Sequence, residues 1–208
     1  MTSRIATITE LRELYREPSQ LVLGKLKPTL DAASIKFIER CPFVLISTLG
    51  ADQKLDVSPR GGPSGFIRVL SDGSIAIPDL NGNNLIDTLR AIVETGRAGL
   101  LFVMPGREET LRVNGTAFVT AEPAVLEGFT TELRTPKSAI VIEPEEVFIH
   151  CAKAFRRGAV WNPETWPTLS DAPDAVDILS CQLELPDSAT AKLRESLMAS
   201  YDGDLAAD

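Results

Sequence analysis

Short apolar segments with two-residue periodicity dominate the middle of the chain. The first is Phe-Val-Leu-Ile-Ser-Thr-Leu at 43–49, and later segments rich in β-branched residues follow at intervals short enough for antiparallel hairpins. We predict strands at 43–49, 53–59, 65–70, 74–78, 98–104, 110–121, 138–144 and 147–152. A series of roughly seven or eight short strands separated by Pro and Gly is typical of a sheet that closes into a barrel and so removes its edges.

Helical periodicity predicts flanking helices around this sheet. A short amphipathic helix opens the chain, and a second runs from Asp31, its expected cap, to about Arg40. A third helix interrupts the strands; we expect Asn83 or Asn84 to cap it and Gly96 to end it. Two further helices are predicted near 124–133 and at 188–200.

Length and charge narrow the functional classes. The 208 residues favour one domain with terminal additions, which we predict as a helical extension at 1–40, a barrel at 41–165 and a tail at 166–208. The net charge of −8 makes a nucleic-acid or anionic-membrane partner unfavourable. No apolar run approaches the roughly 18 residues of a membrane helix, and the start lacks a signal-peptide pattern, so we expect a cytoplasmic protein.

The cysteines and the single histidine point away from metal chemistry. Cys41, Cys151 and Cys181 lie far apart without a Cys-x-x-Cys pair, which fits neither a disulfide framework nor a zinc ribbon. The lone His150 excludes motifs that need two imidazoles, and we expect it to be a hydrogen-bonded structural residue. Residues 114–116, Asn-Gly-Thr, would be a glycan acceptor only after secretion, so we predict a hairpin-type turn there.

Two loops have the residue types that hold an anion. Residues 56–66 combine Ser58 and Arg60 with three glycines, so the backbone can approach a ligand and the guanidinium can donate to phosphate oxygens. Residues 77–84 run from the end of a strand into a helix N-terminus, where free N–H groups and the helix dipole favour phosphate. The alternatives are a Pro/Gly turn with a solvated arginine and a simple asparagine cap. No G-x-G-x-x-G or P-loop pattern is present.

Two later segments supply further cations. Strand alternation places Thr110 and Arg112 on one face, so Arg112 is a candidate pocket cation or, alternatively, a cross-strand partner of a neighbouring acid. Residues 150–161 form a basic cluster in which Lys153, Arg156 and Trp161 suit a planar anionic ligand. The alternative is a solvated basic turn with its aromatic residues in the core.

The order of these segments resembles the pyridoxamine 5′-phosphate oxidase family. The resemblance rests on S-P-R-G-G, N-G-N-N, T-L-R-V-N-G and H-C-A-K-A-F-R-R followed by Trp, and it covers about residues 30–165. It is strongest to a subgroup described as predicted flavin-nucleotide-binding proteins. The implied fold is mainly β with flanking helices: a six-stranded antiparallel split barrel of Greek-key type that binds FMN, here with an N-terminal helical extension.

Members of this family are homodimers that hold two FMN molecules at the subunit interface. The resemblance therefore implies that two chains build each flavin site, with the basic segment at 153–161 donated by the other subunit. Carried over position by position, the implied FMN-binding residues are Ser58, Arg60, Pro78, Asn83, Asn84, Thr110, Arg112, Lys153, Arg156 and Trp161.

Two departures from the family pattern bear on the substrate. Pyridoxamine phosphate oxidases have Ser-Arg-Lys where this chain has Gly82-Asn83-Asn84, and their C-terminal Arg-x-His is missing. We therefore expect an FMN-dependent oxidoreductase with a different small-molecule substrate. The alternatives are a non-catalytic flavin carrier or redox sensor, or a split barrel that binds a deazaflavin or heme, for which His150 is the candidate ligand.

Overall fold

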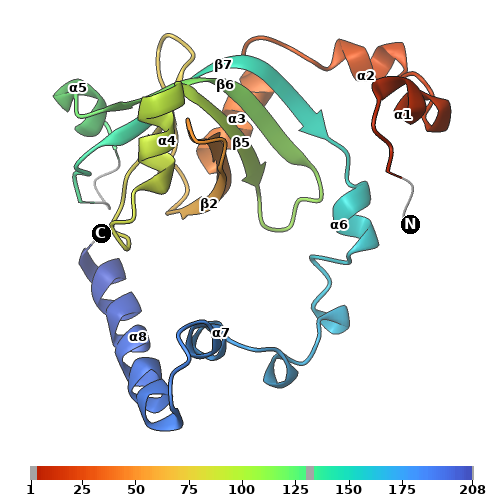
Figure 1. The fold of residues 1–208 in the computed structure, drawn as a ribbon. Coiled ribbons are helices and arrows are strands. Elements are labelled where there is room, and N and C mark those ends of the chain that lie inside the picture. Colours follow the sequence, from red (N-terminus) through yellow and green to blue (C-terminus); the bar gives the residue numbers. More distant parts are fainter. Residues whose placement is uncertain (1–3, 130–133, 208) are drawn as a thin grey trace.

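Residues 4–129 and 134–207, which this computed structural model describes, contain seven strands in one antiparallel sheet (Figure 1). The strand order is β2-β1-β5-β6-β7-β4-β3. The strands are β1 (Phe43–Leu49), β2 (Leu55–Gly61), β3 (Arg68–Val69), β4 (Ile75–Pro78), β5 (Arg97–Val103), β6 (Thr110–Thr120) and β7 (Ala139–His150). The α-helices are α1 (Ile8–Leu14), α2 (Gln20–Gly24), α3 (Ala32–Arg40), α4 (Asp87–Thr95), α5 (Pro123–Leu126), α6 (Lys153–Arg157), α7 (Ala175–Gln182) and α8 (Asp187–Ala207).

The predicted antiparallel split barrel with flanking helices is confirmed, with seven strands in the described residues where the family pattern implies six. The strand β3 is only two residues long and lies at an edge of the sheet. The separate strands predicted at 138–144 and 147–152 are one strand, β7. Pro144 does not end it, because this proline lies beside a β-bulge, where a missing N–H group is tolerated.

The Asn114-Gly115 pair lies in β6 opposite this bulge, so the predicted hairpin turn is wrong. Asn114 pairs with Glu146 and Gly115 with Pro144, which leaves one extra residue on β7. A Cβ atom on Gly115 would lie 1.9 Å from the carbonyl oxygen of Glu143. Glycine is needed here because two strands approach closely. The Asn-Gly dipeptide in the sequence does not reveal this close approach.

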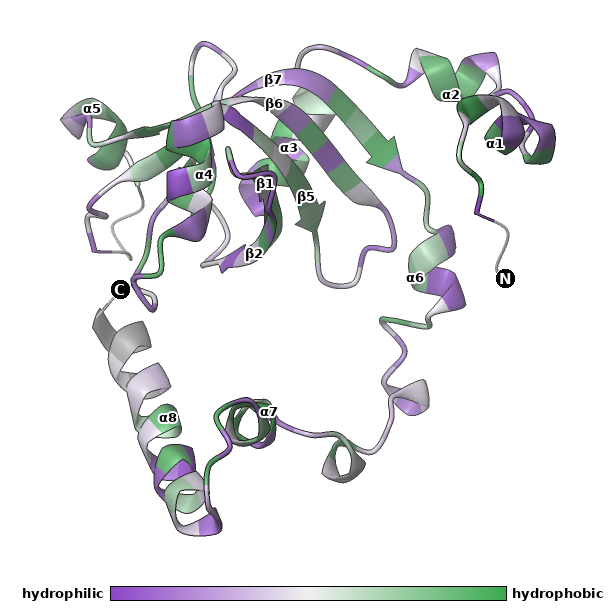
Figure 2. Ribbon diagram, in the orientation of Figure 1, coloured by the Kyte–Doolittle hydropathy of each residue, from purple (hydrophilic) through white to green (hydrophobic). Residues whose placement is uncertain are grey.

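The main core lies on one face of the sheet, and a smaller cluster that includes Ala76, Val141 and residues of α5 lies on the other. Along β6, Leu111 and Val113 point into the core, whereas Arg112 and Asn114 lie on the opposite face, and this alternation is visible in Figure 2. Helices α3 and α4 contribute to the same core, which includes the fully buried side chains Ile38, Val44, Ile46, Phe66, Ile75, Ile77, Phe102 and Ile142.

The predicted helix boundaries are confirmed at two ends and wrong at a third. The carboxylate of Asp31 accepts hydrogen bonds from the first amides of α3, and Gly96 ends α4 with a left-handed φ of 66°. However, neither Asn83 nor Asn84 caps α4. Ile86 occupies the N-cap with a left-handed φ of 53° and no side-chain cap, because Asn83 instead accepts a bond from the amide two residues on.

The terminal segments extend away from the barrel (Figure 1). Before the barrel, α1 and α2 bury no residue, and Lys27 joins β7 through a bridge to Val147. After α6, the chain forms what we call the C-terminal arm, residues 166–207, in which α7 packs against α8. The helix predicted at 188–200 lies within α8. Of the helix predicted near 124–133, the structure has α5, and residues 130–133 lie outside the described residues.

Candidate functional site

A cavity of about 480 Å³ opens between β2, the end of β4 and the start of α4. The β2 strand contributes side chains from its inner face, and the connection from β4 to α4 forms the opposite wall. The structure thus brings together five of the predicted site residues, which come from two segments of the sequence: Ser58, Arg60, Pro78, Asn83 and Asn84.

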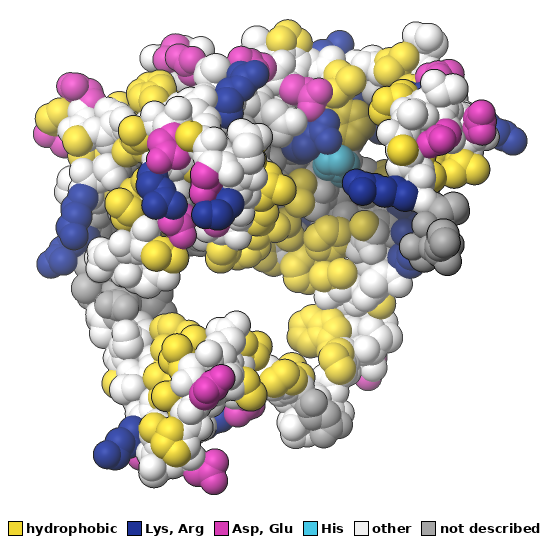
Figure 3. Space-filling model, in the orientation of Figure 1, with side chains coloured by type: hydrophobic (Ala, Val, Ile, Leu, Met, Phe, Trp, Pro, Cys, Tyr) yellow, Lys and Arg dark blue, Asp and Glu magenta, His cyan; other side chains and the backbone are white. Residues whose placement is uncertain are grey.

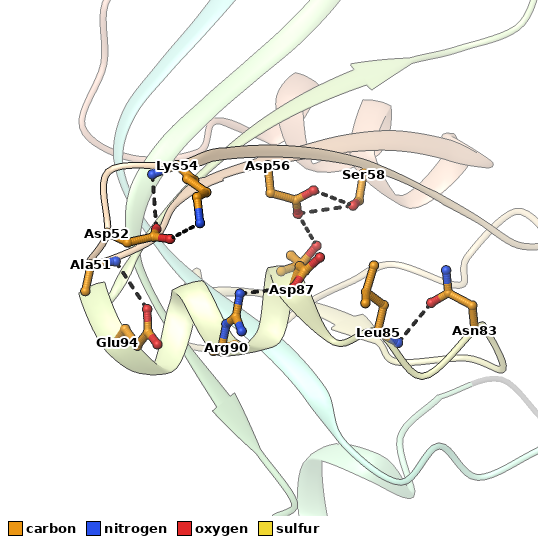
Figure 4. A network of polar contacts seen from close by, with 11 residues as sticks. Ala51, Asp52, Lys54, Asp56, Ser58, Asn83, Leu85, Asp87, Arg90 and Glu94 are labelled. Carbon is orange, nitrogen blue, oxygen red and sulfur yellow. Dashed lines mark hydrogen bonds and ion pairs between the residues drawn. The ribbon is translucent and has the colours of Figure 1, made fainter. Parts of the chain in front are cut away.

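A half-buried carboxylate, Asp56, organises one wall of this cavity. Asp56 accepts a 2.5 Å hydrogen bond from the Thr88 hydroxyl of α4 and 3.1 Å bonds from the Ser58 hydroxyl (Figure 4). Thr88 is only 2% exposed, so these bonds tie β2 to the first turn of the helix. Sequence reasoning missed Asp56 and Thr88. The available signal was that Asp56 shares a strand face with Ser58 and Arg60.

Arg60 is the free cation of the cavity. Its Nη1 donates to the carbonyl of Pro59 at 2.9 Å, and within residues 4–129 and 134–207 it forms no ion pair. Two acidic groups of the wall are already engaged: Asp56 by hydroxyls, as above, and Asp87 by Arg90 at 3.2 Å. The third, Asp79, is half-buried. Burial raises the pKa of its carboxyl, while the charges of Arg60 and Lys137 act in the opposite direction.

The start of α4 borders the cavity without a side-chain cap. Its first amides therefore keep donors that no described side chain satisfies, and the helix dipole adds positive potential at this end. Asn84 and Ile86 both have left-handed backbone, with φ of 59° and 53°. For a β-branched residue this conformation is strained, and strain of this kind is concentrated at functional sites.

A second group of predicted residues lies on β6 and β7. Arg112 forms a 2.5 Å ion pair with Glu146, and its guanidinium carbon lies 5.3 Å from the ring centroid of Phe148. Its Nε is buried and, among the described residues, has no hydrogen-bond partner. Thr110 is buried opposite His150, whose ring packs edge-on against Phe148. Burial, followed by the charge of Arg112, lowers the pKa of His150.

The third group holds the α6 segment against the β5–β6 connection. Arg156 donates to Glu108 at 2.6 Å, and the Trp161 indole donates to the carbonyl of Arg107 at 2.6 Å. The Trp161 ring also packs against Phe155, with centroids 5.6 Å apart. Lys153 is exposed at the start of α6. In its own chain, this group is therefore outside the cavity and secures the segment that leads into the C-terminal arm.

The two faces of the sheet separate these groups. Arg60 pairs with Val44, a core residue. Arg112 pairs with Leu101 of β5, which in turn pairs with Leu45 of β1 on the outer face. Directly paired residues of antiparallel strands share a face. The cavity residues of β2 and the cation of β6 therefore project from opposite sides of one sheet.

Comparison with known proteins identifies the family. The model of the pyridoxamine 5′-phosphate oxidase family matches residues 30–151, from the start of α3 to just after β7. The chain belongs to the pyridoxamine 5′-phosphate oxidase family. In this family member, the matched region contains the whole cavity, whereas the C-terminal arm lies beyond it.

Solved structures with a similar fold have low sequence identity to this member of the oxidase family. No curated protein matches the sequence. HupZ of Group A Streptococcus is 19% identical, with a TM-score of 0.48 over 58% of this chain and 94% of its own. A putative pyridoxamine 5′-phosphate oxidase of Lactobacillus delbrueckii is 19% identical, with a TM-score of 0.46 over 59% and 95%. An FMN-binding protein of Syntrophomonas wolfei is 13% identical, with a TM-score of 0.40 over 64% and 88%. Among the described helices, none has the length and apolarity needed to cross a membrane.

Proposed function

We propose that this chain binds FMN as a homodimer and acts as a flavin-dependent oxidoreductase on a small molecule other than pyridoxamine phosphate. The observation that carries the proposal is the cavity beside α4, where Arg60 and an uncapped helix N-terminus face one space. Its volume of about 480 Å³ is in the range of small-molecule sites.

The cavity suits the phosphate end of FMN. Arg60 and the first amides of α4 would hold the phosphate, and the side chains of Asn83 and Asn84 add neutral donors. Of the acids in the wall, Asp87 is balanced by its ion pair with Arg90, and hydroxyl groups hold the Asp56 carboxylate in place. FMN would supply the redox chemistry by accepting a hydride at N5.

Arg112 suits the flavin ring. Its buried Nε is a donor without a protein partner in the described residues, so a ligand acceptor there would satisfy it. Because Glu146 balances the charge of Arg112, the residue would offer the ring this N–H donor and not an unpaired positive charge. Because Arg112 and Arg60 project from opposite sheet faces, one flavin can contact both only if two protomers contribute. This geometry supports a homodimer with shared sites.

Absorbance spectroscopy of the purified protein, before and after addition of FMN and desalting, tests the binding. We expect bands of oxidised flavin and about 10- to 100-fold weaker FMN binding in Arg60→Ala, since charged hydrogen bonds to the phosphate are lost. Lys54→Ala, which removes an exposed cation outside this cavity, is the matched control. A colourless protein that takes up no FMN would overturn the proposal.

A flavin carrier or redox sensor without turnover is the second candidate. It is favoured because Asp56 and Asp87 are already bound by other side chains. Asp79 is then the one carboxyl of the cavity wall with no hydrogen bond or ion pair to a described side chain. Anaerobic addition of NADPH to the FMN-loaded protein separates the two. Bleaching of the flavin absorbance within seconds supports the oxidoreductase, and unchanged absorbance supports the carrier.

A further inference from the structure

The chain exposes far more surface than a compact monomer of its mass. Its accessible surface is 14241 Å², whereas a folded monomer of 22.5 kDa is expected to expose about 9,500 Å². The excess is several thousand square ångströms. Obligate dimer interfaces bury about 2,000 to 5,000 Å² in total, so a second copy could cover a surface of this size.

Part of this surface belongs to the C-terminal arm. The arm leaves the barrel after α6 and curves back toward it along α8, which encloses an opening (Figures 1 and 3). It exposes large apolar side chains that its own protomer does not cover: Trp166 (57% exposed), Leu169 (81%), Ile178 (47%), Leu183 (61%) and Met198 (60%). A solvated arm with this many exposed apolar groups is unfavourable unless something packs on it.

A second apolar surface lies on the outer face of the sheet. Leu55 and Val57 of β2 are 80% and 64% exposed, and Leu45 and Leu101 continue this face across β1 and β5. Figure 3 shows hydrophobic side chains on the part of the barrel that borders the opening and on the arm across it. The chain therefore presents two apolar surfaces that do not cover each other.

The arm also differs from the rest of the chain in its net charge. Residues 166–207 contain eight acidic and two basic residues, a net charge of −6, whereas residues 1–165 have a net charge of −1. Lys153 and Arg157 of α6 form no ion pair in the described part of the chain. A second copy thus offers the arm both an apolar face and unpaired cations, which a two-fold arrangement provides to both protomers at once.

We propose that the C-terminal arm of each protomer packs on the outer face of β1 and β2 of the other, which leaves Arg112 of β6 to the flavin, in a reciprocal exchange of arms. The proposal goes beyond flavin binding but rests on the homodimer of the proposed function. It assigns the residues after the family-matched region the role of holding the two barrels together. The shared flavin sites then depend on a segment that contacts no part of the cavity wall.

The dimer dissociation constant of the full chain, measured by light scattering and dilution, tests the proposal. We expect a mass of two chains for the native protein. In the double variant Leu169→Asp with Leu183→Asp, we expect a dissociation constant raised at least about tenfold, since buried apolar contacts become buried charges. Both residues are exposed in the protomer, so circular dichroism should be unchanged. Val93→Asp, on an exposed position of α4, is the matched control.

Cross-linking shows which barrel the arm covers. In a Cys151→Ser background, a short bismaleimide should join the native Cys181 of the arm to Val57→Cys, with a product of twice the chain mass. Val93→Cys should give no such product. A product of single mass, no product with Val57→Cys, or a dimer unaffected by the arm variants would overturn the exchange. If the arm variants dissociate the dimer but the protein takes up no flavin, the arm exchange is supported and the proposed function is not. The two proposals can therefore fail separately.

Discussion

Arg60 and Arg112 project from opposite faces of the same sheet. Arg60 shares its face with the core residue Val44, and Arg112 shares the outer face with Leu101. Both are candidate contacts of one flavin, so the sheet itself stands between two groups that the proposed function requires to meet. In the proposed homodimer, each protomer would contribute one of the two arginines, which would remove this conflict.

Mixing two defective variants tests this relationship directly. Homodimers of Arg60→Ala or of Arg112→Ala should each bind FMN weakly. After unfolding and refolding together, random pairing should restore about one site in four, because each mixed dimer has one site with both arginines intact. FMN bound per chain, measured by absorbance after desalting, gives the fraction.

Pairing Arg60→Ala with Asn84→Ala is the control for this mixture. Both side chains line the cavity of one protomer, so every mixed site lacks one of them. Recovery in this control, or none in the first mixture, would contradict the two-chain site.

The β-bulge makes Gly115 intolerant of a side chain. A Cβ would lie 1.9 Å from the carbonyl oxygen of Glu143, and backbone cannot yield as a flexible side chain can. We expect Gly115→Ala to lower the free energy of unfolding by about 3 kcal/mol, as measured by urea denaturation. Gly24→Ala, where nothing lies within 4 Å, should change it little. Equal effects of the two substitutions would refute this account.

The buried Thr88 hydroxyl should stabilise the junction of β2 and α4. Thr88→Val removes the donor to Asp56 and is expected to cost about 1–2 kcal/mol of unfolding free energy. FMN affinity should fall as well, because the start of α4 borders the cavity. Thr95→Val removes a hydroxyl that only donates within its own helix, to Ala91, and should cost less. The prediction fails if Thr95→Val is the more damaging change.

Asp79 should oppose folding at neutral pH. Its folded-state pKa is raised by burial, so the folded protein binds a proton more tightly than the unfolded chain does. Stability from this group is therefore present at acid pH and lost as pH rises above the ordinary value of 3.8 through the raised pKa. We expect Asp79→Asn to raise the melting temperature at pH 7 and to have a smaller effect at low pH.

Asp52→Asn provides a control of opposite sign. Hydrogen bonding by Lys54 lowers the pKa of Asp52, so its neutral substitution should not stabilise the protein at pH 7. Thermal melts of both variants across pH 3 to 8 make the comparison. If Asp79→Asn lowers the melting temperature at pH 7, the assignment of its pKa shift is wrong.

Local patterns predicted the elements whose cause is local. The alternation at 43–49 and 110–121 predicted β1 and β6. Asp31 marks a helix start through its side-chain cap, and Gly96 marks a helix end through its left-handed backbone. The same local reasoning was wrong for Asn114-Gly115. The Asn-Gly signal for a turn was overruled by β7, which approaches so closely that only glycine fits.

The candidate site shows the same division. Arg60 and the asparagines at 83–84 were identified from their residue types and from a family order of motifs, and they meet in one cavity. Thr88 was missed because its hydrogen bond to Asp56 spans 32 residues and leaves no local pattern, whereas the strand face that Asp56 shares with Ser58 was an available signal.

The sequence by itself determined the split barrel, the flanking helices and the family, because strand alternation, helix punctuation and the order of motifs are properties of neighbouring residues. Only the tertiary structure decided which face each cation occupies, where β7 bulges and how far the C-terminal arm stands from the barrel. These features depend on contacts between residues distant in the chain, whose energies are set once the strands have paired and the core has packed.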